Sequence, residues 1–249
     1  MRSVILCVFA TFCILQQPLF AQPVQPSLTL SGGMSIPLGT FAERNPEPLL
    51  RRYQPQEIFQ GTGGAYSGWS LWADLTSPIR KSHVWGWMNS VGVIYQPTRW
   101  HEMLASDDQA QDVLIRSNAW WFITPVTGLQ SRLRLHPQVQ LVLYGQVGVL
   151  MGRRPGMTIR QVIHTGSPLS IGEYTYRIEP SWAAEPVWMI GVKGQIFRRI
   201  YMDVRYLKSV PVYSVPLEVT SDGFLVDNSM THRIRQPIEM IQGTIGLIW

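Results

Sequence analysis

Five side chains in the segments between the strand-like stretches are of types that carry acid–base or metal chemistry. Imidazoles and carboxylates at a rim of loops can activate water or bind a metal ion. These residues are His101, Asp107, Asp108, His164 and His232. No two of the histidines stand at a metal-ligand spacing, and the chain has no Gly-x-Ser-x-Gly or His-Glu-x-x-His string. We therefore interpret them as solvated loop residues and a helix cap, and expect no catalytic residue, cofactor or metal.

A second set of charged side chains falls on the polar side of alternating stretches. Its members are Asp74, Arg132, Lys193, Asp203 and Arg205. Both signs occur, so an enclosed polar space could satisfy these groups through internal ion pairs. The same residues could instead line a lumen that passes or binds small solutes. The choice depends on the elements that carry them.

Period-two alternation of apolar and polar residues predicts eight β-strands. The clearest stretch sets Val139, Leu141 and Leu143 against Gln138 and Gln140. The predicted strands cover residues 27–41, 65–75, 84–95, 119–135, 138–151, 187–197, 200–207 and 238–249.

The connections between these strands alternate in length. Residues 76–83, 136–137 and 198–199 are short links, whereas the other four gaps are long. The long gaps cover residues 42–64, 96–118, 152–186 and 208–237. This layout predicts an all-β fold, an eight-stranded antiparallel up-and-down transmembrane β-barrel with long extracellular loops and short periplasmic turns. A soluble sandwich has no reason to put every long loop at one end.

The charges decide which face of the barrel points outward. A Lys or Arg facing the middle of a bilayer costs about 2 to 4 kcal/mol. The interior of an eight-stranded barrel is just wide enough to be filled by side chains. We therefore expect the apolar faces to meet lipid and the five charged residues above to lie inside. A soluble lipocalin-like barrel would invert this assignment, with an apolar ligand cavity and charges outside.

The first 21 residues predict a secretory signal peptide, which leaves a barrel domain at 22–249. Arg2 precedes an apolar run from Val4 to Leu15, and Ala21 offers a cleavage point. A lipoprotein signal ending at Cys13 is the alternative. The run is too short to span a bilayer, and no later stretch is long and apolar enough. Export through such a signal predicts the cell outer membrane as the location.

Composition narrows the class of partner. The formal charge is +5, and the basic residues are scattered in pairs, so we expect no nucleic-acid partner. The chain has 10 Trp and 9 Tyr, which aromatic girdles at two membrane interfaces would explain. A sugar-binding surface is the alternative for the tryptophans. Their positions are Trp69, Trp72, Trp85, Trp87, Trp120, Trp121, Trp188 and Trp249.

Three stretches in the long gaps predict local structure. Apolar runs flank Ser221-Asp222-Gly223, which is typical of a hairpin. Residues 158–164 and 174–179 predict a second ribbon. Ser106 is followed by Asp107-Asp108-Gln109-Ala110-Gln111-Asp112. This pattern predicts a helix that begins at a serine cap, with acidic residues in its first turn. Protruding loops of this kind are where binding partners are met.

Several of these stretches resemble known strands of one protein family. Residues 28–41, 143–148, 199–206 and 243–249 resemble the first, middle, penultimate and last strands of Bacteroidetes-type outer-membrane β-barrel domain proteins. The resemblance covers nearly all of residues 22–249, although such proteins more often end in Phe. It implies a fold and a location, and it carries over no catalytic residue.

Trp249 completes the last alternating strand, which we expect to pair with residues 28–38. The resemblance implies that Trp249 is a terminal assembly signal read by the barrel-insertion machinery. The function expected is that of a monomeric, non-enzymatic outer-membrane protein in contact with outer-membrane lipid, with a structural role or a loop-mediated role toward an unknown envelope or extracellular ligand. A narrow porin-like channel or transporter for small solutes is the alternative, and a soluble secreted lipocalin-like carrier is the third.

Overall fold

The computed structural model describes most of the chain, and within it the fold is almost entirely β-strand. The predicted signal peptide, residues 1–21, lies outside the described residues. No helix in the described part is both long and apolar enough to cross a membrane. The described residues are 26–43, 58–60, 63–79, 82, 84–98, 111–136, 139–164, 171–196, 199–221 and 224–249.

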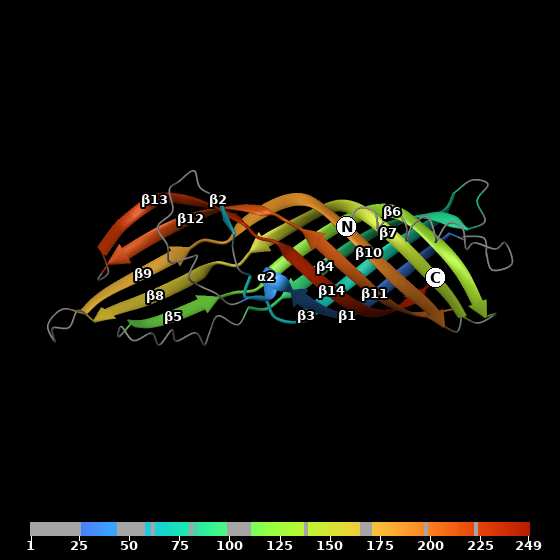
Figure 1. Ribbon diagram of the computed structural model, residues 1–249, viewed down its shortest axis with the longest axis horizontal. Coiled ribbons are helices and arrows are strands. Elements are labelled where there is room, and N and C mark those ends of the chain that lie inside the picture. Colours follow the sequence, from blue (N-terminus) through green and yellow to red (C-terminus); the bar gives the residue numbers. More distant parts are fainter. Residues whose placement is uncertain are drawn as a thin grey trace.

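Eight strands close into one antiparallel barrel (Figure 1). Each pairs with the barrel strands before and after it in the chain, and the first also pairs with the last. This confirms the predicted all-β, eight-stranded, up-and-down antiparallel barrel. The strands are β1 (Ser27–Leu38), β3 (Gly68–Pro78), β4 (Trp85–Gln96), β6 (Trp120–His136), β7 (Val139–Arg154), β10 (Ser181–Ile196), β11 (Ile200–Ser209) and β14 (Ile238–Ile248).

The barrel strands are strongly staggered. Starting at Thr29 of β1 and moving from each residue to its partner on the next strand leads round the barrel to Ile238 of β14. Ile238 is next to Glu239, and Glu239 is the partner of Leu38 in β1. One turn round the barrel therefore advances about ten residues along β1, and a stagger of this size tilts the strands by about 40°. Side chains from distant strands are thereby brought to one level of the interior.

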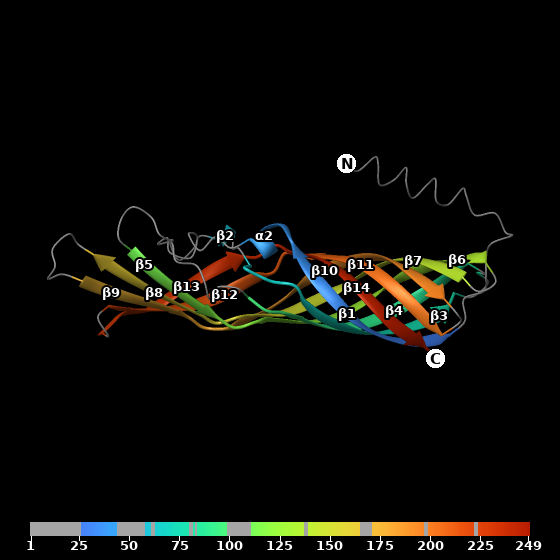
Figure 2. The ribbon, with the colours of Figure 1, turned by 90° about the horizontal axis from the view of Figure 1, so that it is seen from below.

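The two ends of the barrel differ as the sequence predicts. Short links join β3 to β4, β6 to β7 and β10 to β11 at one end, and all long connections leave from the other (Figure 2). Trp249 lies at the short-link end, where its N–H donates to the carbonyl of Leu28 at 2.9 Å and the Leu28 N–H donates back at 3.1 Å. The predicted pairing of the last strand with residues 28–38 is confirmed.

Several predicted strand limits are wrong, and the largest difference is at the sixth strand, which begins at Ser181 rather than at residue 187. The first strand ends at Leu38 rather than at residue 41, because Gly39 adopts a φ of 53° and starts the short helix α2 (Gly39–Ala42). The turn sends Phe41 into the barrel mouth, where it is fully buried. The second barrel strand begins at Gly68 rather than at residue 65, since Ala65 makes only a single bridge with Thr98.

A second sheet of six strands extends beyond the long-connection end of the barrel (Figure 1). The two predicted ribbons are confirmed as the hairpins β8–β9 and β12–β13. Five of the six strands directly precede or follow a barrel strand in the chain. Their order in this sheet is the same as the order of those barrel strands in the barrel, so the sheet prolongs one side of the barrel wall. Its order is β2 (Ile58–Gln60), β13 (Phe224–Arg235), β12 (Val212–Ser221), β9 (Ile171–Ile178), β8 (Met157–His164) and β5 (Gln111–Ser117).

The predicted helix start at Ser106 is wrong where it can be checked. Residues 106–110 lie outside the described part of the chain. Gln111 and Asp112, which the capping pattern includes, belong to strand β5 instead. Pairing of β5 with β8 over seven residues overrides the local preference for a helix.

Polarity is reversed across the barrel wall relative to a soluble protein. Outward side chains of β11 and β14, such as Val204 and Ile245, are largely exposed, the latter at 61%. Inward side chains of the same strands, such as Asp203, Arg205 and Gln242, are buried. The apolar faces therefore point out and the polar faces point in.

Candidate functional site: the sealed barrel interior

Four of the five predicted interior charges form one cluster. The Lys193 ammonium lies 2.8 Å from a carboxylate oxygen of Asp74, and the Arg205 guanidinium lies 3.6 Å from the same oxygen. Arg205 also pairs closely with Asp203. Two cations and two carboxylates make the cluster electrically neutral. Neutrality matters because all four side chains are nearly or fully removed from solvent.

Neutral partners complete this cluster. The Thr29 hydroxyl donates to Asp74 at 3.1 Å, and the Tyr144 hydroxyl donates to Asp203 at 2.8 Å. The Lys193 ammonium lies 4.3 Å from the centroid of the Tyr201 ring, and the Arg205 guanidinium lies 4.3 Å from the Trp72 ring. Cation–π contacts of this kind strengthen when water is excluded. The shell is that of a structural ion cluster rather than of an open binding site.

The strand pattern explains why these residues meet. Lys193 and Asp203 are direct partners in the β10–β11 pairing, and Arg205 follows Asp203 by two residues on the same face. The large Tyr144 ring fits because Gly191 lies opposite it, where any Cβ would overlap the phenol. Gly92 leaves the same kind of room for the Trp72 ring.

A layer of amides, hydroxyls and thioethers lies elsewhere in the barrel interior. Trp72 Nε1–H donates to Gln242 at 2.7 Å. Gln96 donates to the Ser35 hydroxyl at 2.6 Å, and Gln146 donates to the Ser90 hydroxyl at 2.9 Å. These bonds cross the barrel between strands that are not neighbours. Each joins two strands that are separated by one other strand, and together these bonds occupy interior space that a channel would need.

The mouth at the long-connection end is closed by aromatic rings. Phe41 packs edge-on against Trp120 and Phe122, with centroids 5.4 and 5.9 Å apart, and Trp120 contacts Tyr213 at 5.7 Å. The Trp120 indole N–H donates to the carbonyl of Gly63 at 2.9 Å, which fixes the segment after β2 over the mouth. All four rings are buried. We call Phe41, Trp120, Phe122 and Tyr213 the aromatic plug.

A second buried arginine lies next to the aromatic plug. Arg154 is 3% exposed, and none of the ion pairs found among the described residues includes it. It interacts electrostatically with Tyr213 of the aromatic plug. Arg154 thus lacks the carboxylates that surround Arg205.

Of the remaining predicted residues, Arg132 and His232 are described and neither belongs to the ion cluster. Arg132, the fifth interior charge, lies at the short-link end, where it donates to the Ser27 hydroxyl at 3.4 Å. His101, Asp107 and Asp108 lie outside the described residues, as does the side chain of His164 in β8.

The interpretation of His232 as a solvated loop residue is wrong. It lies in β13, where it is 8% exposed, and burial lowers the pKa of its imidazole. No group of three His, Cys, Asp or Glu side chains is placed to hold a metal ion among the residues described. Sequence reasoning also missed Tyr144 and Trp72 as members of the cluster shell, although both lie on polar faces of predicted strands.

Aromatic side chains on the outer wall form a level near the long-connection end. Trp69, Tyr95 and Trp121 contact one another with ring centroids 4.9 to 5.7 Å apart. On the other side of the barrel, Trp188 and Tyr206 contact at 5.3 Å. The outward Lys208–Glu239 ion pair lies beyond Tyr206 on the side of the long connections. Apolar surface therefore gives way to charge just above the aromatic level.

A second aromatic level lies near the short links. Trp87 is exposed on β4, and Trp249 is 64% exposed. Trp87 and Tyr95 lie on the same face of β4, and a rise of about 3.3 Å per residue with a tilt of about 40° puts these two levels roughly 20 Å apart. Trp72 and Trp120 belong to neither level, because both lie inside the barrel. The prediction that belts explain the tryptophans is wrong for these two.

Comparisons with known proteins leave the chain without an assigned family. No family model matches it, and no curated protein matches it. Among solved structures, Ail, the attachment invasion locus protein of Yersinia pestis, is similar with a TM-score of 0.43 and 11% sequence identity, covering 92% of this chain and 100% of that chain. The resemblance to Bacteroidetes-type barrel proteins stays a prediction.

Proposed function

We propose that the protein is an integral outer-membrane barrel that displays its six-stranded sheet outside the cell and has no enzymatic activity. The observation that carries this proposal is the apolar outer wall between two aromatic levels, around an interior of buried charges. The roughly 20 Å between the levels compares with an apolar band of about 25 Å in known outer-membrane barrels. Only a bilayer gives so large an apolar surface a partner on every side of the barrel.

The sealed interior argues against the channel alternative. A solute would have to pass the ion cluster, the hydrogen bonds that cross the barrel and the aromatic plug. Each of these barriers consists of buried side chains in mutual contact. We therefore expect no steady conductance.

The polarity of the two faces argues against the soluble carrier. A lipocalin-like carrier lines its cavity with apolar side chains and exposes its charges. Here the exposed side chains of the barrel wall include Leu71, Met202 and Val204, whereas Asp74 and Arg205 are buried.

The six-stranded sheet is the part of the molecule suited to a binding role. It projects beyond the upper aromatic level, and its exposed side chains include Arg160, Arg177, Arg233 and Arg235. Strand β5 pairs with β8 on one side, and no described strand pairs with its other side. An edge strand of this kind can accept a strand from a protein partner. We expect the partner to be an extracellular or envelope protein.

Heat-modifiable migration tests the membrane proposal. An outer-membrane fraction run on SDS gels without boiling should show a faster band that shifts after boiling, because a closed barrel resists unfolding in detergent. Reconstitution into a planar bilayer should give no steady current. Recovery of the protein in the soluble fraction, or a stable single-channel current, would contradict this function.

A further exchange tests the sheet. Replacing residues 157–178 by a short Gly/Ser turn removes β8 and β9 while leaving the eight barrel strands intact. The variant should remain heat-modifiable. Whole cells that carry it should no longer bind the protein partner. Retained binding would remove the sheet from the proposed role. The role of Trp249 as an assembly signal stays a prediction, and a Trp249→Asp variant with normal membrane levels would refute it.

A further inference from the structure

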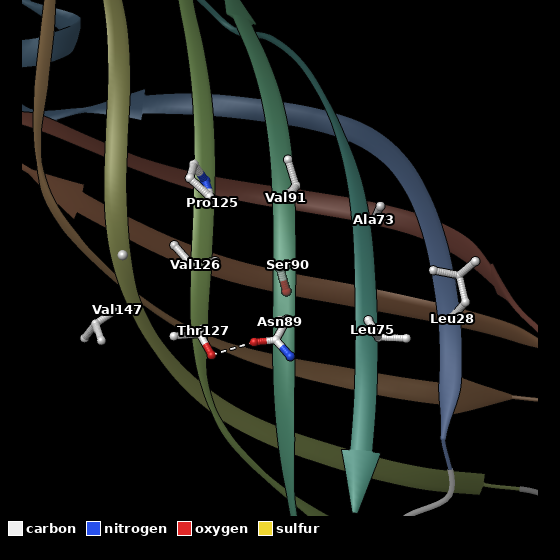
Figure 3. Close-up of a pocket in the computed structure, with 11 residues that line it drawn as sticks. Leu28, Ala73, Leu75, Asn89, Ser90, Val91, Pro125, Val126, Thr127 and Val147 are labelled. Carbon is white, nitrogen blue, oxygen red and sulfur yellow. Dashed lines mark hydrogen bonds between the residues drawn. The ribbon is translucent and has the colours of Figure 1, made fainter.

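The lipid-facing wall contains a polar pair beside a hollow (Figure 3). The Thr127 hydroxyl donates to the side-chain oxygen of Asn89 at 2.7 Å, and both side chains point out of the barrel. Figure 3 shows the Asn89 amide nitrogen turned away from Thr127. No hydrogen bond of that nitrogen is found among the described residues. Two amide N–H donors therefore face the surroundings of the barrel.

The hollow follows from small side chains between larger ones. It measures about 530 Å³ and crosses β1, β3, β4, β6 and β7. Ala73, Pro125 and Thr127 are short, whereas Leu28 and Val147 stand at its two sides. A methylene group fills about the same volume as a water molecule, roughly 30 Å³, so the hollow has room for roughly one lipid chain.

The height of the polar pair identifies which part of a lipid it meets. Asn89 lies two residues above Trp87 of the lower aromatic level, on the same outward face of β4. Aromatic belts mark the headgroup region, so the Asn89 donors lie near the boundary where glycerol esters meet acyl chains. From Asn89 the hollow extends across the tilted strands toward Val147, which lies closer to the long-connection end.

We infer that the hollow holds one acyl chain of a diacyl phospholipid of the periplasmic leaflet, with Asn89 donating a hydrogen bond to its ester carbonyl. This inference rests on the proposed membrane location. An ester carbonyl accepts hydrogen bonds and carries no charge, which matches an amide donor in a hollow whose lining residues carry no charge. A second copy of the chain fits less well, because a two-fold contact would put hollow against hollow and leave the space unfilled.

Native mass spectrometry of the intact barrel, released from nanodiscs of phosphatidylethanolamine, tests the site. The wild-type protein should retain one lipid. Ala73→Leu fills the hollow and Asn89→Val removes the donors, so each should lower the retained fraction at least fivefold. Val204→Leu, which adds outward bulk on β11 away from the hollow, should leave retention unchanged. An ether-linked lipid has no ester carbonyl. The wild type should therefore retain it as weakly as the Asn89→Val variant retains the ester lipid.

The outcomes separate this inference from the membrane proposal. Each variant is first checked for heat-modifiable migration, which reports a folded barrel. Two results would overturn the lipid site alone. In the first, the wild type and the variants are all heat-modifiable and retain lipid equally. In the second, the wild type is a dimer and Ala73→Leu dissociates it. Recovery of the wild type as a soluble protein without detergent would overturn the membrane proposal as well.

Discussion

Two buried arginines illustrate how the two ends of the barrel interior differ. Arg205 lies in the lower half, in contact with two carboxylates and over the Trp72 ring. Arg154 lies at the mouth beside the aromatic plug and makes none of the ion pairs found among the described residues. The first is part of a neutral cluster, whereas the second lies beside Tyr213 and has no ionic partner in the described part of the chain.

The difference follows from what surrounds each end. The lower cluster lies at the level of the apolar band. In the proposed membrane location lipid cannot solvate a charge there, so each charge needs its balance inside the wall. The mouth lies beyond the upper aromatic level, where the wall continues as an open sheet. There the aromatic plug contributes through the packing of buried rings. The lower half is therefore held by electrostatic balance and the mouth by packed rings.

Removing one carboxylate should break the lower half most severely. Asp74→Leu leaves Lys193 and Arg205 with Asp203 alone, and loss of one partner of a buried ion pair costs about 3 to 5 kcal/mol. We expect this loss in the free energy of unfolding, measured by urea titration in lipid vesicles. The double variant Asp74→Leu/Lys193→Met restores neutrality and should recover more than half of the loss. Equal stability of the single and double variants would contradict a charge-balanced cluster.

Truncating the plug should weaken the mouth without affecting the charges. Phe41→Ala removes a fully buried ring, and such a change typically costs about 3 kcal/mol. The same urea titration should show the loss, and hydrogen exchange should rise first in the amides near α2. Trp69→Ala, which truncates an exposed outer ring, serves as the control and should change stability much less. A steady current through Phe41→Ala but not through the wild type would identify the plug as the main barrier.

Exchange of each arginine for an apolar residue tests the comparison directly. Arg205→Met should destabilise strongly, since two carboxylates are left with one cation. Arg154→Met removes a buried charge that makes no ion pair in the described part of the chain, so we expect the free energy of unfolding to change by about 1 kcal/mol or less in either direction. Equal losses in the two variants would show that Arg154 has an acidic partner.

Much of the barrel could be predicted from alternation, because each strand has one apolar and one polar face. The residues of the ion cluster could be predicted for the same reason: Asp74, Lys193 and Asp203 all fall on polar faces. Their grouping could not, since it depends on the stagger, which is set by pairing around the whole barrel. Arg132 has the same pattern and yet lies at the short-link end.

The mouth was harder to predict than the wall. The predicted first strand runs on to Phe41, whereas the left-handed backbone at Gly39 ends the strand at Leu38 and starts α2, which carries Phe41. Trp120 and Trp72 were grouped with interface tryptophans because residue type alone does not tell a belt from a core. The two hairpins were predictable from their turns, whereas their union with β5 into one sheet depends on non-local pairing.

Protonation of His232 should produce the smallest effect, and only in the sheet. Burial lowers the pKa of this imidazole in the folded protein, so the folded state favours the neutral form. The associated stability is present above the unfolded pKa near 6.5 and is lost as the pH falls through the lowered folded value. Between pH 7.5 and 5 we expect the first thermal transition, from the sheet, to fall by about 2 °C. His232→Gln, neutral at both pH values, should abolish this dependence, and an unchanged slope would assign it to other groups.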